Sequence, residues 1–306
     1  MTEANNQSKK RQNDVATAVI KTGSSANLPT GLYLVATPIG NLRDITLRAL
    51  DVLANADFIL AEDTRHSRRL LDRYNLQTPM RSYHEHNADK VTDNILQALQ
   101  EGKAVALISD AGTPLVSDPG FKLVQAAITA DLPVIPIPGA SAVLTAISAS
   151  GLPTDKFLFA GFTPAKSSAR IKFLQNLKNT PASLVFFEAP GRVLRSLEDM
   201  AKVFNDRPAV LARELTKIHE TFIRETITDL IAKLQGQKIR GECVILIGPA
   251  QEQLPSLSES QIDAGLLEAI SRIGTKAAAN EIAQVSGRPM REMYQRALQL
   301  KNKDYE

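Results

Sequence analysis

Short, nearly unbroken apolar runs alternate with amphipathic stretches through the first half of the chain, and this alternation constrains the fold more than any other feature. The apolar runs lie at residues 32–36, 58–61, 104–108 and 134–137. Runs of this length and composition are typical of strands that are covered on both faces. The amphipathic stretches are typical of helices and lie at residues 46–55, 64–74, 88–101 and 121–130. Because strands alternate with helices, the pattern predicts right-handed crossovers and a mostly parallel sheet.

The second half of the chain changes its pattern after Gly151, Leu152 and Pro153. Strands are predicted at residues 157–162, 183–187, 209–212, 221–226 and 243–247. Helices are predicted near 168–177 and 193–204, so several strands follow one another without a helix between them. That order indicates a mixed sheet in a separate domain. The predicted fold class is therefore α/β, with a parallel α/β domain at 31–140 and a mixed α/β domain at 141–249.

Both ends of the chain differ from this α/β region. Residues 1–30 are rich in Asn, Gln, Ser, Thr and Lys, which predicts a disordered tail. Residues 250–306 are predicted to form a linker and a small helical domain, with helices at 259–272, 275–285 and 289–300. The last two helices have the spacing of a helix-turn-helix, but six basic residues stand against four acidic ones from 275 onward. The sequence therefore favours neither nucleic-acid contact nor protein packing as the role of this domain.

Composition excludes several classes of protein but selects none. Cys243 is the single cysteine, so an intramolecular disulfide is impossible, and no Cys/His cluster has the spacing of a metal site. The apolar segment 134–150 is interrupted by Pro136, Pro138 and Gly139, which argues against a membrane-spanning helix. We therefore expect a cytoplasmic protein without a structural metal site, while assistance of the reaction by a divalent metal stays open. The net charge of +3 only weakly favours anionic partners.

Loops of small residues follow two of the predicted strands. The loop at 109–120 is dense in Gly, Pro, Ser and Asp, and the loop at 138–142 reads Pro-Gly-Ala-Ser-Ala. Ligands in open parallel sheets bind beyond the carboxyl ends of the strands, so adjacent strand ends without bulky side chains predict a hollow for a nucleoside or amino-acid moiety. The alternative is an ordinary strand-to-helix connection. A dinucleotide site is less well supported, because the loop at 37–41 lacks the G-x-G-x-x-G pattern, although Glu62 lies where such a fold keeps its ribose acid.

Four segments in this order resemble motifs of the tetrapyrrole methylase superfamily, at residues 33–42, 61–65, 109–114 and 138–142. The resemblance covers about residues 31–248, and the helical tail is also similar to a domain of its ribosomal RNA methyltransferase branch. It implies two α/β domains with a cleft between them that binds S-adenosyl-L-methionine. It further implies ribose 2′-O-methylation of a cytidine in the decoding centre of 16S ribosomal RNA, within the 30S subunit, by a homodimer.

The same resemblance implies which residues bind the methyl donor. The loop after the first strand contributes two of them, the small-residue loops most of the others, and the second domain the last two. They are Pro38, Gly40, Ala111, Gly112, Thr113, Val116, Ser141, Ala142, Glu188 and Leu215.

Methyl transfer to a ribose hydroxyl requires positioning, a proton acceptor and a nearby cation. Our hypothesis makes Asp63 or His84 the general base, with Lys217 stabilising the developing charge. Asp63 stands just before a predicted helix, so it is equally interpretable as a helix N-cap. His84 and His86 are alternatively two surface histidines on an edge strand.

Basic side chains around the cleft are predicted to contact RNA. The helix after Thr64 carries His66 and Arg73 beside the arginines named below. The positive charge extends onto the second domain through four further residues, Lys166, Arg170, Lys172 and Arg195. The predicted RNA contacts are Glu62, Arg65, Arg68, Arg69, His86, Arg192 and Arg213. Two rival functions remain: methylation of a small anionic macrocycle such as a tetrapyrrole precursor, and a non-catalytic ribosome-binding module.

Overall fold

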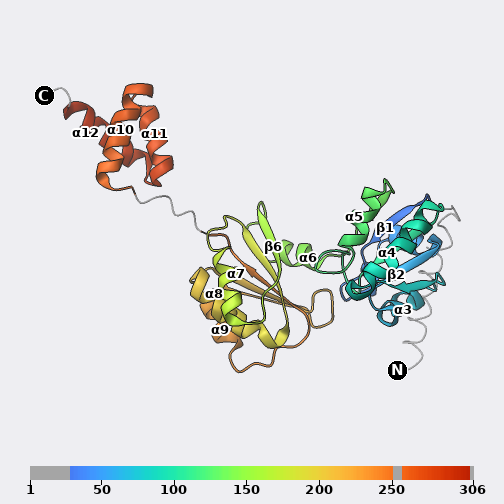
Figure 1. Cartoon of the computed structure of the whole chain (residues 1–306). Coiled ribbons are helices and arrows are strands. Elements are labelled where there is room, and N and C mark those ends of the chain that lie inside the picture. The colour runs from blue at the N-terminus through green and yellow to red at the C-terminus, as the bar shows by residue number, and fades with distance from the viewer. Residues whose placement is uncertain (1–27, 251–256, 304–306) are drawn as a thin grey trace. The chain divides into compact units, whose positions relative to one another are not determined.

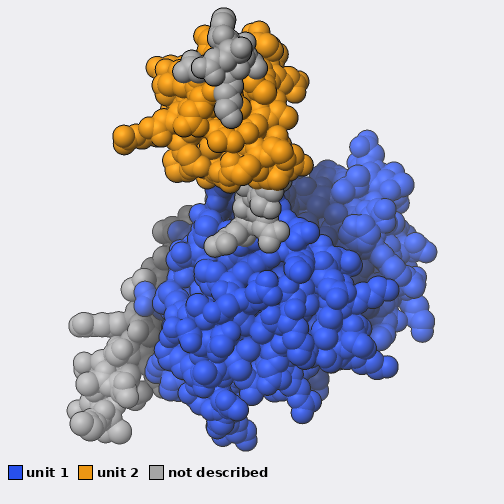
Figure 2. Space-filling view, turned by 90° about the vertical axis from the view of Figure 1, so that its left-hand side faces the viewer, with its two compact units in different colours: residues 1–250 blue, residues 251–306 orange. Residues whose placement is uncertain are grey.

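The computed structural model describes residues 28–250 and 257–303 and contains two compact units, residues 1–250 and 251–306 (Figure 2). Almost all of the predicted disordered tail, and most of the predicted linker, lie outside the described residues. Unit 1 carries two five-stranded sheets, and unit 2 carries three helices (Figure 1). In the described part of the chain, no helix has the length and apolar character needed to cross a membrane.

The first sheet is parallel throughout, as the alternation of strands and helices predicts. Its strands are β1 (Gly31–Val35), β2 (Phe58–Ala61), β3 (Met80–Ser82), β4 (Ala104–Ile108) and β5 (Val134–Ile137), in the order β3-β2-β4-β1-β5. β2 and β4 are buried at every position, which explains why their sequences are unbroken apolar runs. β3 is an edge strand of three residues, none of them fully buried.

Helices cover both faces of the first sheet. The helices of this half of the chain are η1 (Leu42–Asp44), α2 (Leu47–Asn55), α3 (Thr64–Arg73), α4 (Glu85–Gln100), α5 (Phe121–Thr129) and α6 (Ala142–Ser148), of which α6 packs against the second sheet instead. Leu53 of α2 and Leu71 of α3 belong to the core on one face, while Leu99 of α4 and Leu123 of α5 belong to the core on the other. Because both faces are covered, the strand ends are the part of the sheet left open for a ligand.

The second sheet is mixed, also as predicted. Its strands are β6 (Phe157–Phe162), β7 (Ser183–Glu188), β8 (Pro208–Arg213), β9 (Thr221–Thr226) and β10 (Cys243–Ile247), in the order β6-β7-β10-β8-β9. Only β6 and β7 are parallel to each other. Its other elements are α7 (Ser167–Gln175), η2 (Pro190–Arg192), α8 (Val193–Phe204) and α9 (Ile227–Leu234). One face of the sheet packs against α8 and α9 through a core that includes Leu197 and Leu230.

The other face of the second sheet packs against the first half of the chain. Val185, Val210 and Leu246 from this sheet share a hydrophobic core with Ile39 and Val143. This shared core holds the loop after β1 and the start of α6 against the second sheet. The site described below therefore lies within one compact unit, while the predicted boundary between the two α/β domains at residue 140 stays a prediction.

Unit 2 is a bundle of three helices, α10 (Glu259–Ile273), α11 (Thr275–Ser286) and α12 (Met290–Lys303). Leu266, Ile282 and Met293 belong to its core. Gly287 ends α11 in the left-handed conformation with φ of 69°, a backbone geometry that glycine adopts without strain. The three helices that the sequence predicts are thus present.

Candidate functional site

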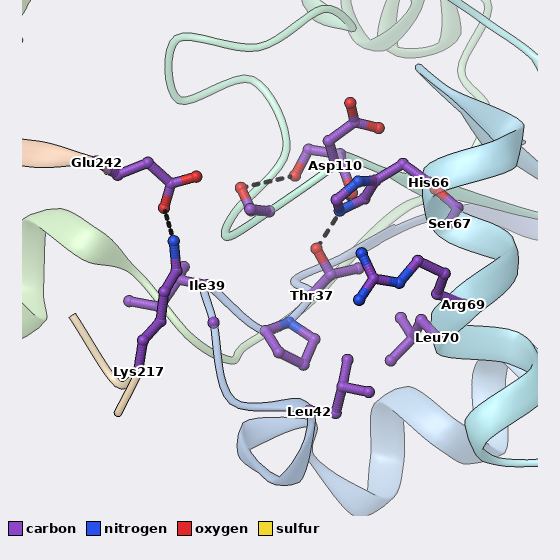
Figure 3. A pocket seen from close by; sticks show the side chains of 14 residues that line it. Thr37, Ile39, Leu42, His66, Ser67, Arg69, Leu70, Asp110, Lys217 and Glu242 are labelled. Carbon is purple, nitrogen blue, oxygen red and sulfur yellow. Dashed lines mark hydrogen bonds and ion pairs between the residues drawn. The ribbon is translucent and has the colours of Figure 1, made fainter. Parts of the chain in front are cut away.

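Two adjoining cavities lie where the loops of the first sheet meet the second sheet. We call the smaller one the narrow cavity, with a volume of about 330 Å³, and the larger one the wide cavity, with a volume of about 550 Å³ (Figure 3). The residues that line both are Ile39, Asp110, Ala111 and Glu242. The two cavities are therefore separated only by a shared wall.

The narrow cavity is built from small residues on one side and from the second sheet on the other. The loop after β4 and the start of α6 contribute the first side, and the ends of β7 and β10 contribute the second. Seven of the ten predicted donor residues line it: Ala111, Gly112, Thr113, Val116, Ser141, Ala142 and Glu188. Because these side chains are small and lie at strand ends, they leave room for a ligand, as the sequence predicts.

Hydrogen bonds between loops hold the shared wall in place. Thr37 and Gly112 form an isolated antiparallel bridge, with N···O distances of 2.8 and 2.9 Å. The buried Thr37 hydroxyl donates to the Ser109 carbonyl at 3.1 Å, and Thr113 donates to the Ala140 carbonyl at 3.2 Å. Gly112 has φ of 83°, a conformation that side-chain-bearing residues rarely adopt. The loops after β1, β4 and β5 therefore form one connected structure.

The three remaining predicted donor residues lie elsewhere. Pro38 and Gly40 line the wide cavity. Leu215 lines neither cavity, because its side chain is buried in the core shared by the two sheets. A Cβ atom at Gly40 would lie 2.9 Å from the Leu215 carbonyl oxygen and 2.5 Å from Cγ of Lys217, so Gly40 permits a close approach of two loops.

Glu188 is a buried carboxylate at the wall of the narrow cavity. It is 2% exposed and accepts hydrogen bonds from the Thr163 hydroxyl, from the Ser196 hydroxyl at 2.6 Å and from the Ala189 backbone at 2.8 Å. The Arg192 guanidinium forms an ion pair with it at 2.6 Å. A buried charge requires such partners, so this network fixes the orientation of Glu188.

The wide cavity has a more polar lining. His66, Ser67 and Arg69 approach it from α3, and Lys217 approaches from the loop after β8 (Figure 3). The Lys217 ammonium contacts Glu214 at 2.9 Å and Glu242 at 2.8 Å. Partial burial lowers the pKa of Lys217, but these two carboxylates more than offset that effect and hold the pKa above its usual value. Lys217 is thus a cation held in place at the wide cavity, and its role in stabilising charge stays a prediction.

Asp63 is the N-cap of α3. Its carboxylate accepts from the backbone amide of Arg65 at 2.8 Å and of His66 at 3.4 Å, and it forms an ion pair with the Arg65 side chain at 3.1 Å. Hydrogen bonds from the Arg65 side chain and backbone lower the pKa of Asp63 to about 2. Asp63 lines neither cavity. The geometry favours the capping interpretation. A carboxylate with so low a pKa is a weak base, and transfer of a proton to it has little driving force.

His84 and His86 belong to the start of α4, so the interpretation of an edge strand is wrong. His84 is the N-cap residue, and its backbone amide donates to Asn87 Oδ1 at 2.9 Å. His84 is half-buried, His86 is exposed, and their rings are 6.0 Å apart. Neither histidine lines the narrow or the wide cavity.

Three carboxylates form a group beside the shared wall, and we call Glu62, Asp110 and Asp118 the acid group. Asp110 lines both cavities and accepts a hydrogen bond from the Asp63 amide at 3.1 Å. Burial, followed by repulsion from Asp110 and Glu85, raises the pKa of Glu62. Burial, followed by repulsion from Glu62, raises the pKa of Asp118 to about 6. A carboxylate that lines a cavity and has a raised pKa, as Asp118 does, is a candidate proton acceptor at neutral pH.

Asp110 and Asp118 are not among the predicted site residues, because the small residues of their loop dominate its sequence pattern. A signal was present, since both are acids in a loop that directly follows a central strand. Across the described residues, no set of three or more His, Cys, Asp or Glu side chains is arranged to hold a metal ion.

The predicted RNA contacts are distributed unevenly around the site. Arg69 lines the wide cavity, while Arg65 and Arg68 are exposed on the same helix. Arg192 is paired with Glu188, and Arg213 donates from Nε to the Thr221 hydroxyl at 3.2 Å. Only Arg69 of this set therefore presents a cation to a cavity.

Arg170 has a structural role, which corrects its placement among the residues that extend the positive charge. Its side chain is 3% exposed and forms an ion pair with the buried Asp199 at 2.7 Å. It also donates to the carbonyls of Pro164 and Ala165. Because it is buried between α7 and α8, it is not available to a phosphate group.

Known proteins resemble the chain over most of its length. A model of the family described as Tetrapyrrole (Corrin/Porphyrin) Methylases matches residues 31–231. A Mesorhizobium japonicum protein named "Ribosomal RNA small subunit methyltransferase I" is 48% identical over 277 residues, which cover 90% of this chain and 94% of that protein. A protein of the same name from Pseudomonas aeruginosa is 46% identical over 280 residues, covering 89% and 98%.

Solved structures share the fold of unit 1. Uroporphyrin-III-C-methyltransferase from Thermus thermophilus has a TM-score of 0.52 at 22% identity, covering 72% of this chain and 94% of that chain. A Thermus structure described as complexed with S-adenyl homocysteine has a TM-score of 0.50 at 19% identity, covering 71% and 97%.

Proposed function

The chain belongs to the tetrapyrrole methylase family, and from this premise we propose that it transfers a methyl group from S-adenosylmethionine to small-subunit ribosomal RNA. Relatives with that name match nearly the whole chain. In finer detail, we propose as acceptor the ribose 2′-hydroxyl of a cytidine in the decoding centre of 16S RNA, within the 30S subunit. The observation that carries the proposal is that the two cavities share the lining residues Ile39, Asp110, Ala111 and Glu242, which supports a donor in one cavity and an acceptor in the other.

The narrow cavity fits the donor in size and in charge. Its volume of about 330 Å³ lies within the usual range for small-molecule sites. Its acidic lining residues are Asp110, Asp118, Glu188 and Glu242. When bound, S-adenosylmethionine supplies an activated methyl group on a positively charged sulfur, and acidic side chains complement that charge. The small residues after β4 allow an adenosine or methionine moiety to lie against the backbone.

The wide cavity then receives the hydroxyl that attacks the methyl group. The hydroxyl must lose its proton during transfer, and of the acid group Asp110 lines both cavities while Asp118 lines the narrow one. We propose that Asp110 or Asp118 of this group accepts the proton, with Lys217 stabilising negative charge. The earlier hypothesis of Asp63 or His84 as the base remains a competing proposal.

Asp118→Asn distinguishes these assignments. We expect it to lower kcat by roughly 100-fold if this group takes the proton. It should also stabilise the fold at pH 7, because burial and repulsion make the charged form of Asp118 unfavourable. The pKa of Asp118 is higher in the folded protein than in the unfolded chain. Its protonated form therefore contributes stability that is fully present below pH 3.8 and is lost as the pH rises through about 6. After allowance for solvent screening, we expect a gain of about 1 kcal/mol at pH 7 and none at pH 4.

Asp63→Asn is the comparison. It removes the exposed ion pair with Arg65 but keeps a side chain that caps a helix equally well, so it should change stability little and leave kcat within a few-fold of the parent. Turnover is measured with labelled donor and stability by urea unfolding at both pH values. If Asp63→Asn or a matching His84 variant loses turnover while Asp118→Asn and Asp110→Asn do not, the competing proposal is correct.

The function itself is tested by mass mapping of ribosomal RNA from cells with and without this protein. We expect one ribose methyl group to disappear from a small-subunit cytidine when the protein is absent. Purified protein with labelled donor should restore it on 30S subunits. Methylation of a precorrin-type substrate instead, or donor binding without turnover on authentic subunits, would select one of the rival functions.

We also propose that the protein works as a cytoplasmic homodimer. Exposed apolar side chains on α5, α6 and β6 support an interface, because large exposed apolar residues often mark contact surfaces. They include Phe121, Ile128, Leu144 and Phe157.

A further inference from the structure

We propose that the wide cavity is a pocket for one nucleotide that has been unstacked from the RNA, with the Ser67 hydroxyl and the Arg69 guanidinium as its recognition groups. This inference rests on the proposed function. It goes beyond it by naming the conformation in which the acceptor nucleotide enters the cavity and the side chains that recognise it.

The size and position of the cavity exclude a base-paired helix. Its volume of about 550 Å³ is that of a small-molecule site, and its walls come from α3, from the loops after β1, β4 and β8, and from Glu242. An RNA duplex is far wider than a pocket of this volume. Enzymes that act on an atom inside a stacked nucleic acid extrude the nucleotide into a pocket, and RNA is most often recognised through unstacked nucleotides.

Ser67 carries a buried hydroxyl that has no partner. The residue is 3% exposed, lines the wide cavity, and its Oγ makes no hydrogen bond with any residue that the structure describes (Figure 3). Buried hydroxyls in proteins are almost always paired, because leaving one unpaired destabilises the fold. A serine hydroxyl reorients by a single side-chain rotation, so a ligand in the cavity can supply the missing partner.

Arg69 supplies the charge that a nucleotide requires. It lies on α3 beside Ser67, and its guanidinium extends toward Thr37 (Figure 3). Arg69 is exposed and has no ion pair within residues 28–250. Lys217, across the cavity, is held by its ion pairs with Glu214 and Glu242, whereas Arg69 has no such partner among the described residues to hold it. Arg69 is therefore the cation best suited to hold the phosphate of the extruded nucleotide.

Ser67→Ala separates recognition from structure. We expect kcat/KM for 30S subunits to fall about 3- to 10-fold, the effect of one hydrogen bond. The Tm should stay the same or rise, because the variant removes an unsatisfied hydroxyl. The matched control is Ser183→Ala, which removes a buried hydroxyl that donates to the Pro153 carbonyl at 2.6 Å. That control should lower Tm by a few degrees and leave kcat/KM unchanged.

Arg69→Ala tests the phosphate contact, with Lys90→Ala as its control. Lys90 is an exposed cation on α4 that lines neither cavity. We expect Arg69→Ala to weaken binding of an RNA hairpin that carries the cytidine to be methylated, by about 10-fold or more. Lys90→Ala should change it less than twofold. Donor affinity, measured by calorimetry, should be unchanged in both variants because Arg69 does not line the narrow cavity.

The conformation of the nucleotide is observed directly with a fluorescent cytidine analogue at the modified position of the hairpin. Its emission should rise when the parent protein binds, because unstacking relieves quenching, and should not rise with Arg69→Ala. The inference is overturned if the parent methylates the RNA without any rise, or if Ser67→Ala lowers Tm and leaves kcat/KM unchanged. Failure of the parent to methylate any small-subunit RNA would instead overturn the proposed function.

Discussion

Replacing Glu188 with alanine is expected to destabilise the protein by about 3–5 kcal/mol and to remove measurable donor binding. The substitution removes the carboxylate that forms an ion pair with the Arg192 guanidinium. The same carboxylate accepts hydrogen bonds from the hydroxyls of Thr163 and Ser196 and from the Ala189 amide. Removing one partner of a buried ion pair costs more than the pair contributes, since the remaining charge is left without compensation. Urea unfolding measures the first effect, and calorimetry with S-adenosylmethionine measures the second.

Two further variants separate the causes. Asp89→Ala removes the partner of Lys122 in an ion pair whose side chains are 78% and 67% exposed, and it should change stability by less than about 1 kcal/mol. Glu188→Gln retains the shape and one acceptor oxygen but not the charge, so it should destabilise less than the alanine variant. If Glu188→Ala is as stable as Asp89→Ala, the buried network does not support this wall of the narrow cavity.

Replacing Gly40 with alanine is the second large expected effect, with a loss of methyl transfer of about 100-fold. The new Cβ would lie 2.5 Å from Cγ of Lys217 and 2.9 Å from the Leu215 carbonyl oxygen, distances that require the two loops to move apart. The backbone contact cannot be relieved by a side-chain rotation. Such overpacking costs roughly 1–3 kcal/mol of stability. A displacement of Lys217 also disturbs the wide cavity. The loss of methyl transfer is measured as kcat with saturating donor and 30S subunits.

Gly248→Ala is the matched control for this substitution. Its Cβ would be 3.4 Å from the nearest atom, the Pro208 carbonyl oxygen, which is ordinary contact. We expect wild-type turnover and a small change in stability. Equal turnover in Gly40→Ala and the parent would show that the close approach of the two loops is not required for catalysis.

The residues of the central strands were predictable because burial on both faces leaves a local signal. β2 and β4 are fully buried, and each is an unbroken apolar run in the sequence. β3 carries no such run, since it is a three-residue edge strand with exposed positions. α9 was not predicted, although Leu230 and Leu234 are buried against the second sheet. Its eight residues are too short for periodicity alone to identify them with assurance.

The small-residue loops of the narrow cavity were also predictable, because a cavity needs short side chains at strand ends whatever the rest of the chain does. The roles of the charged residues were not. Asp63 became a helix cap and Arg170 a buried ion pair, while Asp110 and Asp118 were overlooked. A charged side chain has the same sequence signature whether it caps, pairs or faces a ligand.

By itself, the sequence determined the α/β class, the three C-terminal helices and the family, because apolar periodicity and small-residue turns are local properties. Only the tertiary structure decided which side chains meet at the shared wall, where Ile39, Asp110 and Glu242 come from three distant segments. Burial, pairing and pKa depend on neighbours that are remote in the chain, and those neighbours exist only after the two sheets have packed together.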